Sequence, residues 1–266
     1  MPRNPYIQVH ARRRRNRLRV TGRATSLGRW LVPALAAVVL VPLVRPVFLS
    51  FLDLDREAWG AGLEGVAVRV GVVLIGVLAL DVYTALIRSP DRPILDLHPV
   101  DPGQVVVFEA VRVAEERAWL LPVLGLLLGP IGWEGSFGAW LAVMGVAVGS
   151  FALGLTGSVA MHLLAVEVAE SPRFGPLLDM GRGYNQRAQA AFIYAPGAVL
   201  AAAGGLVMLA SWGVGQAWSG QPAGLLLLAV PFAGAALAWV PVARLASRNW
   251  FRATAVLADI DARYAA

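Results

Sequence analysis

Residues 66–87 read VAVRVGVVLIGVLALDVYTALI, and this stretch decides the fold. Its charged side chains are Arg69 and Asp81, and it is as long as the roughly 20 residues that a helix needs to cross the hydrocarbon core of a bilayer. Backbone amides in lipid must be hydrogen-bonded within their own segment, so the run predicts a membrane-spanning helix. It lacks the alternation of apolar and polar residues that is typical of a half-buried strand.

Other long apolar runs lie on both sides of this one. Hydrophobic residues make up 58% of the chain, charged residues 15%, and the mean hydropathy is +0.63, whereas a soluble domain carries about a quarter charged residues. We therefore expect an all-α polytopic membrane protein with six transmembrane helices. The expected spans cover about residues 30–49, 66–87, 119–131, 139–166, 190–214 and 223–245. The third is short and holds Pro122 and Pro130, so a re-entrant segment is the alternative there.

The basic residues are all arginines, and their positions predict the orientation. With six crossings, most of them lie on one side: in a basic segment over 1–29, in the two loops that follow the second and fourth spans, and in a tail over 246–266. The positive-inside bias places both termini in the cytoplasm, and we expect the plasma (inner) membrane. The arginines of the first segment would contact anionic lipid. A cleaved signal is the alternative, but the apolar run that follows is too long and lacks a cleavage site.

Four polar residues within the spans are candidate functional groups, because charge inside a bilayer is costly. Arg45 and Arg69 lie about one turn from an outer end, where they can extend toward a set of acidic residues: Asp53, Asp55, Glu57 and Glu64. Asp81 either pairs with an arginine at the inner face or lines a path for cargo. His162 stands alone near the end of the fourth span, and we interpret it as a packed helix residue.

Residues for several kinds of chemistry are missing from the sequence. The chain has no cysteine, and no lysine is present to complete a Walker A loop, so a self-contained P-loop ATPase is excluded. No serine–histidine–aspartate arrangement appears, and no histidines or carboxylates are spaced as metal or haem ligands. We therefore expect no enzymatic activity, no cofactor and no nucleic-acid partner. The span centres also lack the carboxylates that a proton-driven carrier needs.

Residues 89–103 read SPDRPILDLHPVDPG and form a proline-rich polar loop between the second and third spans. Valines and alanines alternate with charged residues over 105–117 at helical spacing, which predicts a short amphipathic cytoplasmic helix after the loop. A set of glycines is spaced for close helix packing in lipid: Gly125, Gly129, Gly145, Gly149, Gly154 and Gly157.

The loop resembles one in type-2 ABC exporter permeases, which have the form S-P-x-x-x-x-L-x-x-x-P-V just after the second span. Here that pattern is Ser89-Pro90, Leu95 and Pro99-Val100, followed by the amphipathic helix. The resemblance implies the transmembrane half of an ATP-driven exporter, paired with a second permease copy or paralogue and with separate soluble ATPase subunits. The loop residues implied to contact the ATPase are Asp91, Arg92, Asp96, His98 and Asp101.

The sequence departs from that family at two places, and other functions stay open. His98 stands where an ordinary residue precedes the Pro-Val pair, and the reversal near Trp218 between the last two spans is short. The alternative function is a non-transporting integral membrane scaffold or assembly protein, in which 89–103 is a solvated loop without a partner. A membrane enzyme ranks third because no catalytic arrangement supports it.

Overall fold

The structure is a computed structural model, and it describes residues 31, 33–43, 45–46, 56–87, 101–173 and 184–265. The side chains over 184–190 and 256–265 are not described. The loop residues Asp91, Arg92, Asp96 and His98 lie outside the described residues, as does the basic segment 1–29.

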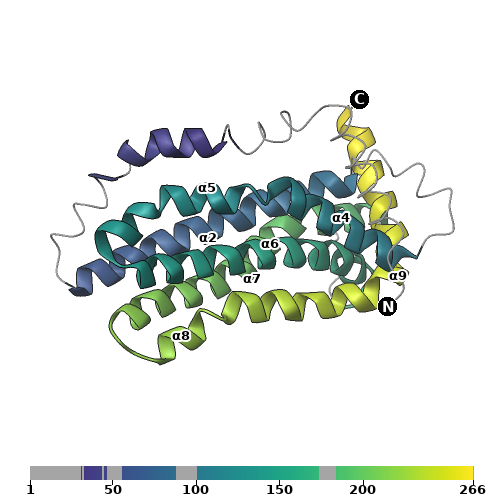
Figure 1. Ribbon diagram of the computed structural model, residues 1–266. Coiled ribbons are helices and arrows are strands. Elements are labelled where there is room, and N and C mark those ends of the chain that lie inside the picture. The colour runs from purple at the N-terminus through teal and green to yellow at the C-terminus, as the bar shows by residue number, and fades with distance from the viewer. Residues whose placement is uncertain are drawn as a thin grey trace. The chain divides into compact units, whose positions relative to one another are not determined.

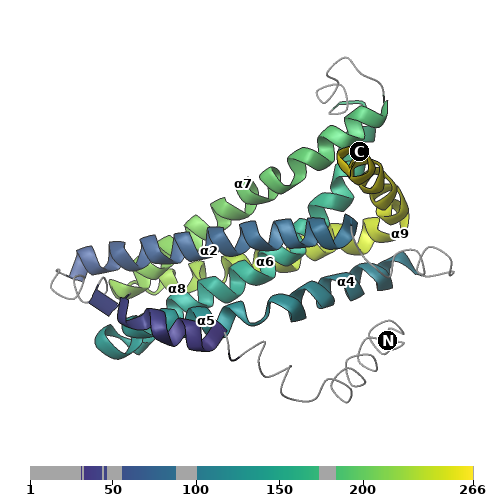
Figure 2. The same cartoon turned by 90° about the horizontal axis from the view of Figure 1, so that it is seen from above.

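Helices account for nearly all of the described chain, and no strand occurs in it (Figure 1). The long helices are α2 (Arg56–Ile87), α6 (Phe137–Glu170), α7 (Tyr184–Trp218) and α9 (Val230–Ala265). The shorter ones are α4 (Pro102–Arg117), α5 (Leu120–Leu127), the π-helical turn η1 (Ile131–Gly135) and α8 (Ala223–Leu227). Figure 2 shows the same helices from above.

Five helical stretches are long and apolar enough to cross a membrane, so the chain is a multi-pass membrane protein by the length and composition of its helices. They are Ala58–Ala85, Pro102–Gly135, Phe137–Glu170, Gly197–Trp218 and Ala223–Ala253. The expected span over 30–49 is represented by a shorter apolar helix, Pro33–Leu43. The expected third span and the helix before it form one helical stretch over 102–135, so the structure leaves the predicted number of six crossings open.

The chain divides into two compact units, and the first comprises Met1–Val70, Ala114–Val148 and Met208–Ala229. Its aromatic residues join helices that are distant in the sequence. Trp59 of α2 is buried and packs edge-on against Trp218 of α7, with ring centroids 6.0 Å apart. The indole of Trp140 on α6 donates a hydrogen bond to the carbonyl oxygen of Gly125 on α5 at 3.1 Å.

The second unit comprises Gly71–Val113, Gly149–Val207 and Val230–Ala266. Within it α2 and α6 are parallel, because contacts advance along both helices in step. Gly71 lies beside Ser150, and Gly154 lies against Ile75. About two turns further along both helices, the rings of Tyr83 and His162 are 5.7 Å apart. In each of these three pairs, the residue on α6 follows the residue on α2 by the same number of sequence positions.

In the same unit α9 is parallel to α6, and α7 is antiparallel to α2. Gly149 of α6 packs against Pro231 of α9, and Glu167 of α6 accepts a hydrogen bond from Asn249 of α9. In both pairs the α9 residue lies 82 positions after the α6 residue, so contacts advance along the two helices in the same direction. Along α2 and α7 the order is reversed: Gly71 meets Val207, whereas Gly76 meets Leu200. The C-terminal ends of α2, α6 and α9 therefore point in one direction.

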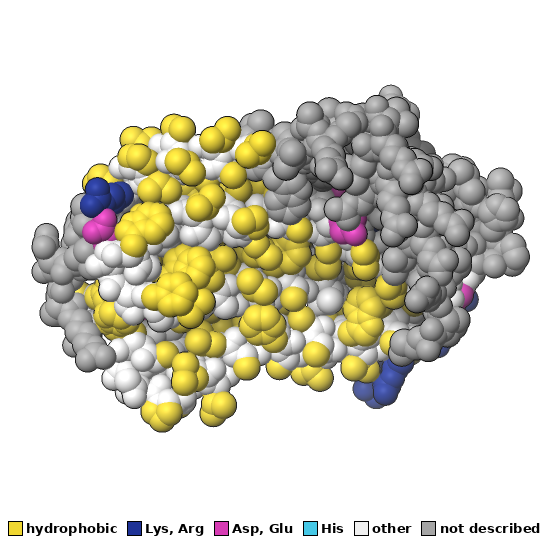
Figure 3. Space-filling view, viewed as in Figure 1, with side chains coloured by type: hydrophobic (Ala, Val, Ile, Leu, Met, Phe, Trp, Pro, Cys, Tyr) yellow, Lys and Arg dark blue, Asp and Glu magenta, His cyan; other side chains and the backbone are white. Residues whose placement is uncertain are grey.

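Large apolar side chains cover much of the described surface that is visible in Figure 3. Examples with at least half of their area exposed are Val73, Leu80, Leu141, Met208, Leu226 and Leu237. A water-soluble protein seldom exposes so many large apolar groups together, but lipid chains solvate them without cost. The exposed surface thus supports the conclusion drawn from helix length.

The helix directions predict how single cysteines will react, and the cysteine-free chain is a ready background for the test. Ser136 precedes α6 and Ser219 follows α7, so both should lie on one side of the membrane. Ser171 follows α6 and should lie on the other side. A membrane-impermeant maleimide applied to intact cells should label the variants of one side only: either both Ser136→Cys and Ser219→Cys, or Ser171→Cys alone. The variants of the other side should be labelled only after the cells are permeabilised. The unsubstituted chain should stay unlabelled. Labelling of Ser219→Cys in the same class as Ser171→Cys, and not with Ser136→Cys, would contradict the antiparallel course of α6 and α7.

Candidate functional site

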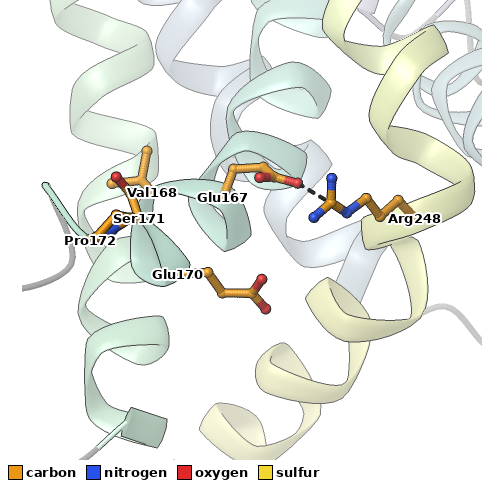
Figure 4. Close-up of a pocket in the computed structure, with 6 residues that line it drawn as sticks. All are labelled: Glu167, Val168, Glu170, Ser171, Pro172 and Arg248. Atoms are coloured by element: carbon orange, nitrogen blue, oxygen red, sulfur yellow. Dashed lines mark ion pairs between the residues drawn. The ribbon is translucent and has the colours of Figure 1, made fainter.

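A group of polar contacts joins the end of α6 to α9, and we call it the α6–α9 polar contact. It consists of Glu167, Glu170, Arg248, Asn249 and Arg252. Because the two helices are parallel here, the contacts keep the same order along both: Glu167 meets Asn249, and Glu170 further along α6 meets Arg252 further along α9. Figure 4 shows Glu167 and Arg248 facing each other across the two helices.

Asn249 is the buried centre of this contact, with none of its surface exposed. Its amide nitrogen donates to the backbone carbonyl of Leu163 and to Oε1 of Glu167, both at 3.1 Å. Both partners only accept hydrogen bonds, so the nitrogen and not the oxygen must face them. The amide oxygen Oδ1 is buried and has no hydrogen-bond partner within the described part of the chain. Asn249 therefore fixes the register of α9 on α6.

Two ion pairs flank Asn249. Arg252 Nη1 lies 2.9 Å from Glu170 Oε1, and Arg248 Nε lies 3.6 Å from Glu167 Oε1. The arginine side chains are 55% and 65% exposed, so solvent screens these pairs and each contributes well under the energy of a buried pair. The pairs set charge opposite charge, which favours one alignment of the two helices over a shifted one.

An open cleft of about 450 Å³ lies beside the contact (Figure 4). Its lining residues are Glu167, Val168, Glu170, Ser171, Pro172 and Arg248. The carboxylates of Glu167 and Glu170 already face arginines. The arrangement is suited to holding helices together and to passing a displacement of one to the other.

Asp101 is the one residue of the expected coupling loop that the structure describes, and it caps α4. Its carboxylate Oδ1 accepts a hydrogen bond from the Gly103 amide at 3.0 Å, and its carbonyl oxygen accepts from Gln104 and Val105. An aspartate before a proline at the first helical position is a strong start signal for a helix. The loop thus ends at a fixed point.

The four intramembrane candidates lie at separate places. Arg45 donates from Nε to Glu134 Oε1 at 2.7 Å in the first unit, a partner that the sequence analysis did not suggest. Arg69 is exposed on α2, and Asp81 is partly buried on the same helix. His162 is 1% exposed, and its Nδ1 lies 2.6 Å from the Ser158 carbonyl oxygen, so Nδ1 carries the proton. The expectation of a packed helix residue agrees with this burial.

A buried ion pair on α4 was also missed by sequence reasoning. Glu109 is 3% exposed, and its Oε2 lies 2.7 Å from Arg112 Nη2, one turn along the helix. The three-residue spacing of opposite charges was visible, but an i,i+3 pair on a helix is usually a surface feature. Likewise, the spacing of Glu167 and Glu170 against Arg248 and Arg252 was visible, but only the fold brings the two sets together.

The comparisons with known proteins supply no relative. No family model, no curated protein and no solved structure matches this chain. No group of three or more histidine, cysteine, aspartate or glutamate residues within the described residues is placed to hold a metal ion.

Replacing Asn249 should loosen the α6–α9 polar contact. Asn249→Ala removes two interhelical hydrogen bonds, which in membrane proteins contribute about 0.6 kcal/mol each. The melting temperature of the detergent-purified protein should therefore fall by about 2–4 °C. Ser247→Ala changes an exposed neighbour on the same helix and should leave the melting temperature unchanged. Equal melting temperatures for both variants would mean that Asn249 does not hold the helices together.

Proposed function

We propose that this chain is the membrane-spanning permease subunit of an ATP-driven exporter of the type-2 ABC class. The observation that carries the proposal is the way in which the polar loop 88–100 is anchored at both ends. It leaves α2 at Ile87 and enters α4 at the capping Asp101, and both helices pack in the same unit. A force on such a loop would reach the transmembrane helices directly.

The contact between these helices supports such a transmission. One small cavity of about 10 Å³ is lined by residues of all three helices: Val82 and Ala85 of α2, Val106 and Val113 of α4, and Val159 of α6. Close-packed interiors deform little, so a displacement of α4 would move α2 and α6 with it. The α6–α9 polar contact would extend the movement to α9.

Six crossings with both termini in the cytoplasm fit the helix directions and the arginines together. The C-terminal ends of α2, α6 and α9 carry the arginine-rich side and would face the cytoplasm. The helix Pro33–Leu43 would then be the core of a first crossing, because the nine arginines before residue 30 otherwise fall outside. The membrane would be the plasma (inner) membrane.

In this arrangement α4 is the short amphipathic cytoplasmic helix, and α5 with η1 forms the third crossing. Charged residues crowd the C-terminal half of α4: Glu109, Arg112, Glu115, Glu116 and Arg117. Placing so many charges in hydrocarbon would be costly, which favours water or the headgroup region for α4. Residues 120–135 would span about 24 Å at 1.5 Å per residue, slightly less than the hydrocarbon core.

The proposal requires partners for energy and for a complete path. Two soluble ATPase subunits would contact the loop at Asp91, Arg92, Asp96, His98 and Asp101, and a second permease copy or paralogue would complete the translocation path. The chain itself would hydrolyse no nucleotide and hold no cofactor. A non-transporting scaffold with a solvated loop is the competing function, and it requires no ATPase.

Reversing two loop charges tests the proposal. Arg92→Asp with Asp96→Arg keeps the net charge but breaks any fixed register of charges with a partner. The tagged protein, purified from its own host's membranes in mild detergent, should co-purify a soluble Walker A protein and ATPase activity. The double variant should recover at least fivefold less of both.

A matched reversal at the opposite membrane face serves as the control. Arg56→Glu with Glu57→Arg also preserves the net charge and should leave ATPase recovery unchanged. Equal recovery with both double variants would remove the loop as the ATPase contact. Absence of any co-purified ATPase from the unsubstituted chain would favour the scaffold.

A further inference from the structure

One row of residues on α9 changes from apolar to cationic side chains within about one helical turn. Successive members lie four positions apart, so each is a neighbour of the next, and all of them are exposed. At 3.6 residues per turn, each step shifts the row by about 40° around the helix. In order they are Phe232, Ala236, Val240, Arg244, Arg248 and Arg252. Phe232 and Val240 are more than 40% exposed, which is typical of side chains that face acyl chains.

The change from apolar to cationic residues marks the boundary of the hydrocarbon core on α9. Val240 and Arg244 are separated by about 6 Å along the helix axis at 1.5 Å per residue. An arginine one turn beyond an exposed valine lies where lipid phosphates begin and can extend its guanidinium outward to them. Arg244 is therefore the first cation of the row to meet the headgroup region.

Arg244 differs from the two arginines that follow it, because no carboxylate lies opposite. The separation that sets Asn249 opposite Glu167 also puts Arg244 at the level of His162 on α6, where α6 carries no carboxylate. Arg248 and Arg252 face Glu167 and Glu170 instead. No hydrogen bond or ion pair engages Arg244 within the part of the chain that the structure describes. Arg248 Nε lies 3.6 Å from Glu167 Oε1, but the Arg248 side chain is 65% exposed and so remains accessible to a ligand.

We propose that Arg244, together with the exposed side chain of Arg248, binds the phosphate of an anionic phospholipid in the leaflet at this end of α9. The guanidinium groups supply donors in a geometry that matches phosphate oxygens. The exposed apolar residues of the same row, Phe232 to Val240, lie where the acyl chains of that lipid would run. This continuity favours a lipid over a soluble phosphate, which would make no use of an apolar row.

This site is separate from the arginines of 1–29, and it depends only on α9 being a membrane-spanning helix. It holds whether the chain is an exporter subunit or a scaffold. Because the side chain of Arg244 is exposed, its substitution removes a ligand-binding group without opening a cavity in the packed interior.

Native mass spectrometry of the full-length detergent-purified protein, titrated with phosphatidylglycerol, measures the proposed binding. Arg244→Gln should raise the apparent Kd of the tightest phosphatidylglycerol about fivefold, the factor expected for one arginine at an anionic headgroup. Arg244→Lys should recover part of the affinity. Arg69→Gln, which removes an exposed arginine from the first unit, is the matched control and should leave the Kd unchanged.

Two further arms separate lipid from other ligands. Phosphatidylcholine should bind weakly and equally to all variants, and inorganic phosphate at millimolar concentration should not displace phosphatidylglycerol. Equal Kd values for Arg244→Gln and Arg69→Gln would overturn the site. Full displacement by inorganic phosphate would overturn its assignment to a lipid.

Discussion

The close approach of α6 to α2 at Gly154 is the constraint on which the rest of the second unit depends. A Cβ atom at this position would lie 3.0 Å from the Cα of Ile75 and 3.4 Å from the Cβ of Leu78, so there is little room for a larger residue. In lipid the hydrophobic effect gives no preference for one helix contact over another, and van der Waals packing between small residues decides. Glycine here lets the two backbones meet.

This approach sets which polar groups meet further along the helices. Tyr83 and His162 come together two turns beyond Gly154 because the two helices advance in step. Gly149 plays the matching part toward α9, where Pro231 and Phe232 pack against it. The resulting register places Asn249 opposite Glu167. The polar contacts are therefore consequences of packing between small residues many positions away, and they in turn exclude a shifted alignment.

Helix type and approximate position were predictable from the sequence, because length and apolar character in lipid leave few alternatives. The expected 139–166 and 190–214 fall within α6 and α7. The ends were harder to predict. Residues 56–65 continue α2 beyond the apolar run, since a helix end in water depends on propensity and capping rather than on lipid. The helix expected over 105–117 begins at Pro102, inside the stretch expected to be a loop, because Asp101 caps it. The partners of Arg45 and Asn249 depend on long-range packing that no local pattern encodes.

The central claim is that α2 and α6 meet at Gly154. A disulfide between Leu78→Cys and Gly154→Cys tests it most directly in the cysteine-free chain, because the two Cβ positions are 3.4 Å apart, close to the spacing of a disulfide. Copper phenanthroline in native membranes should cross-link this pair, and should leave Leu78→Cys with Gly145→Cys uncross-linked, since Gly145 has no neighbour within 4 Å of its Cβ position. Cross-linking of the Gly145 pair without the Gly154 pair would contradict the account.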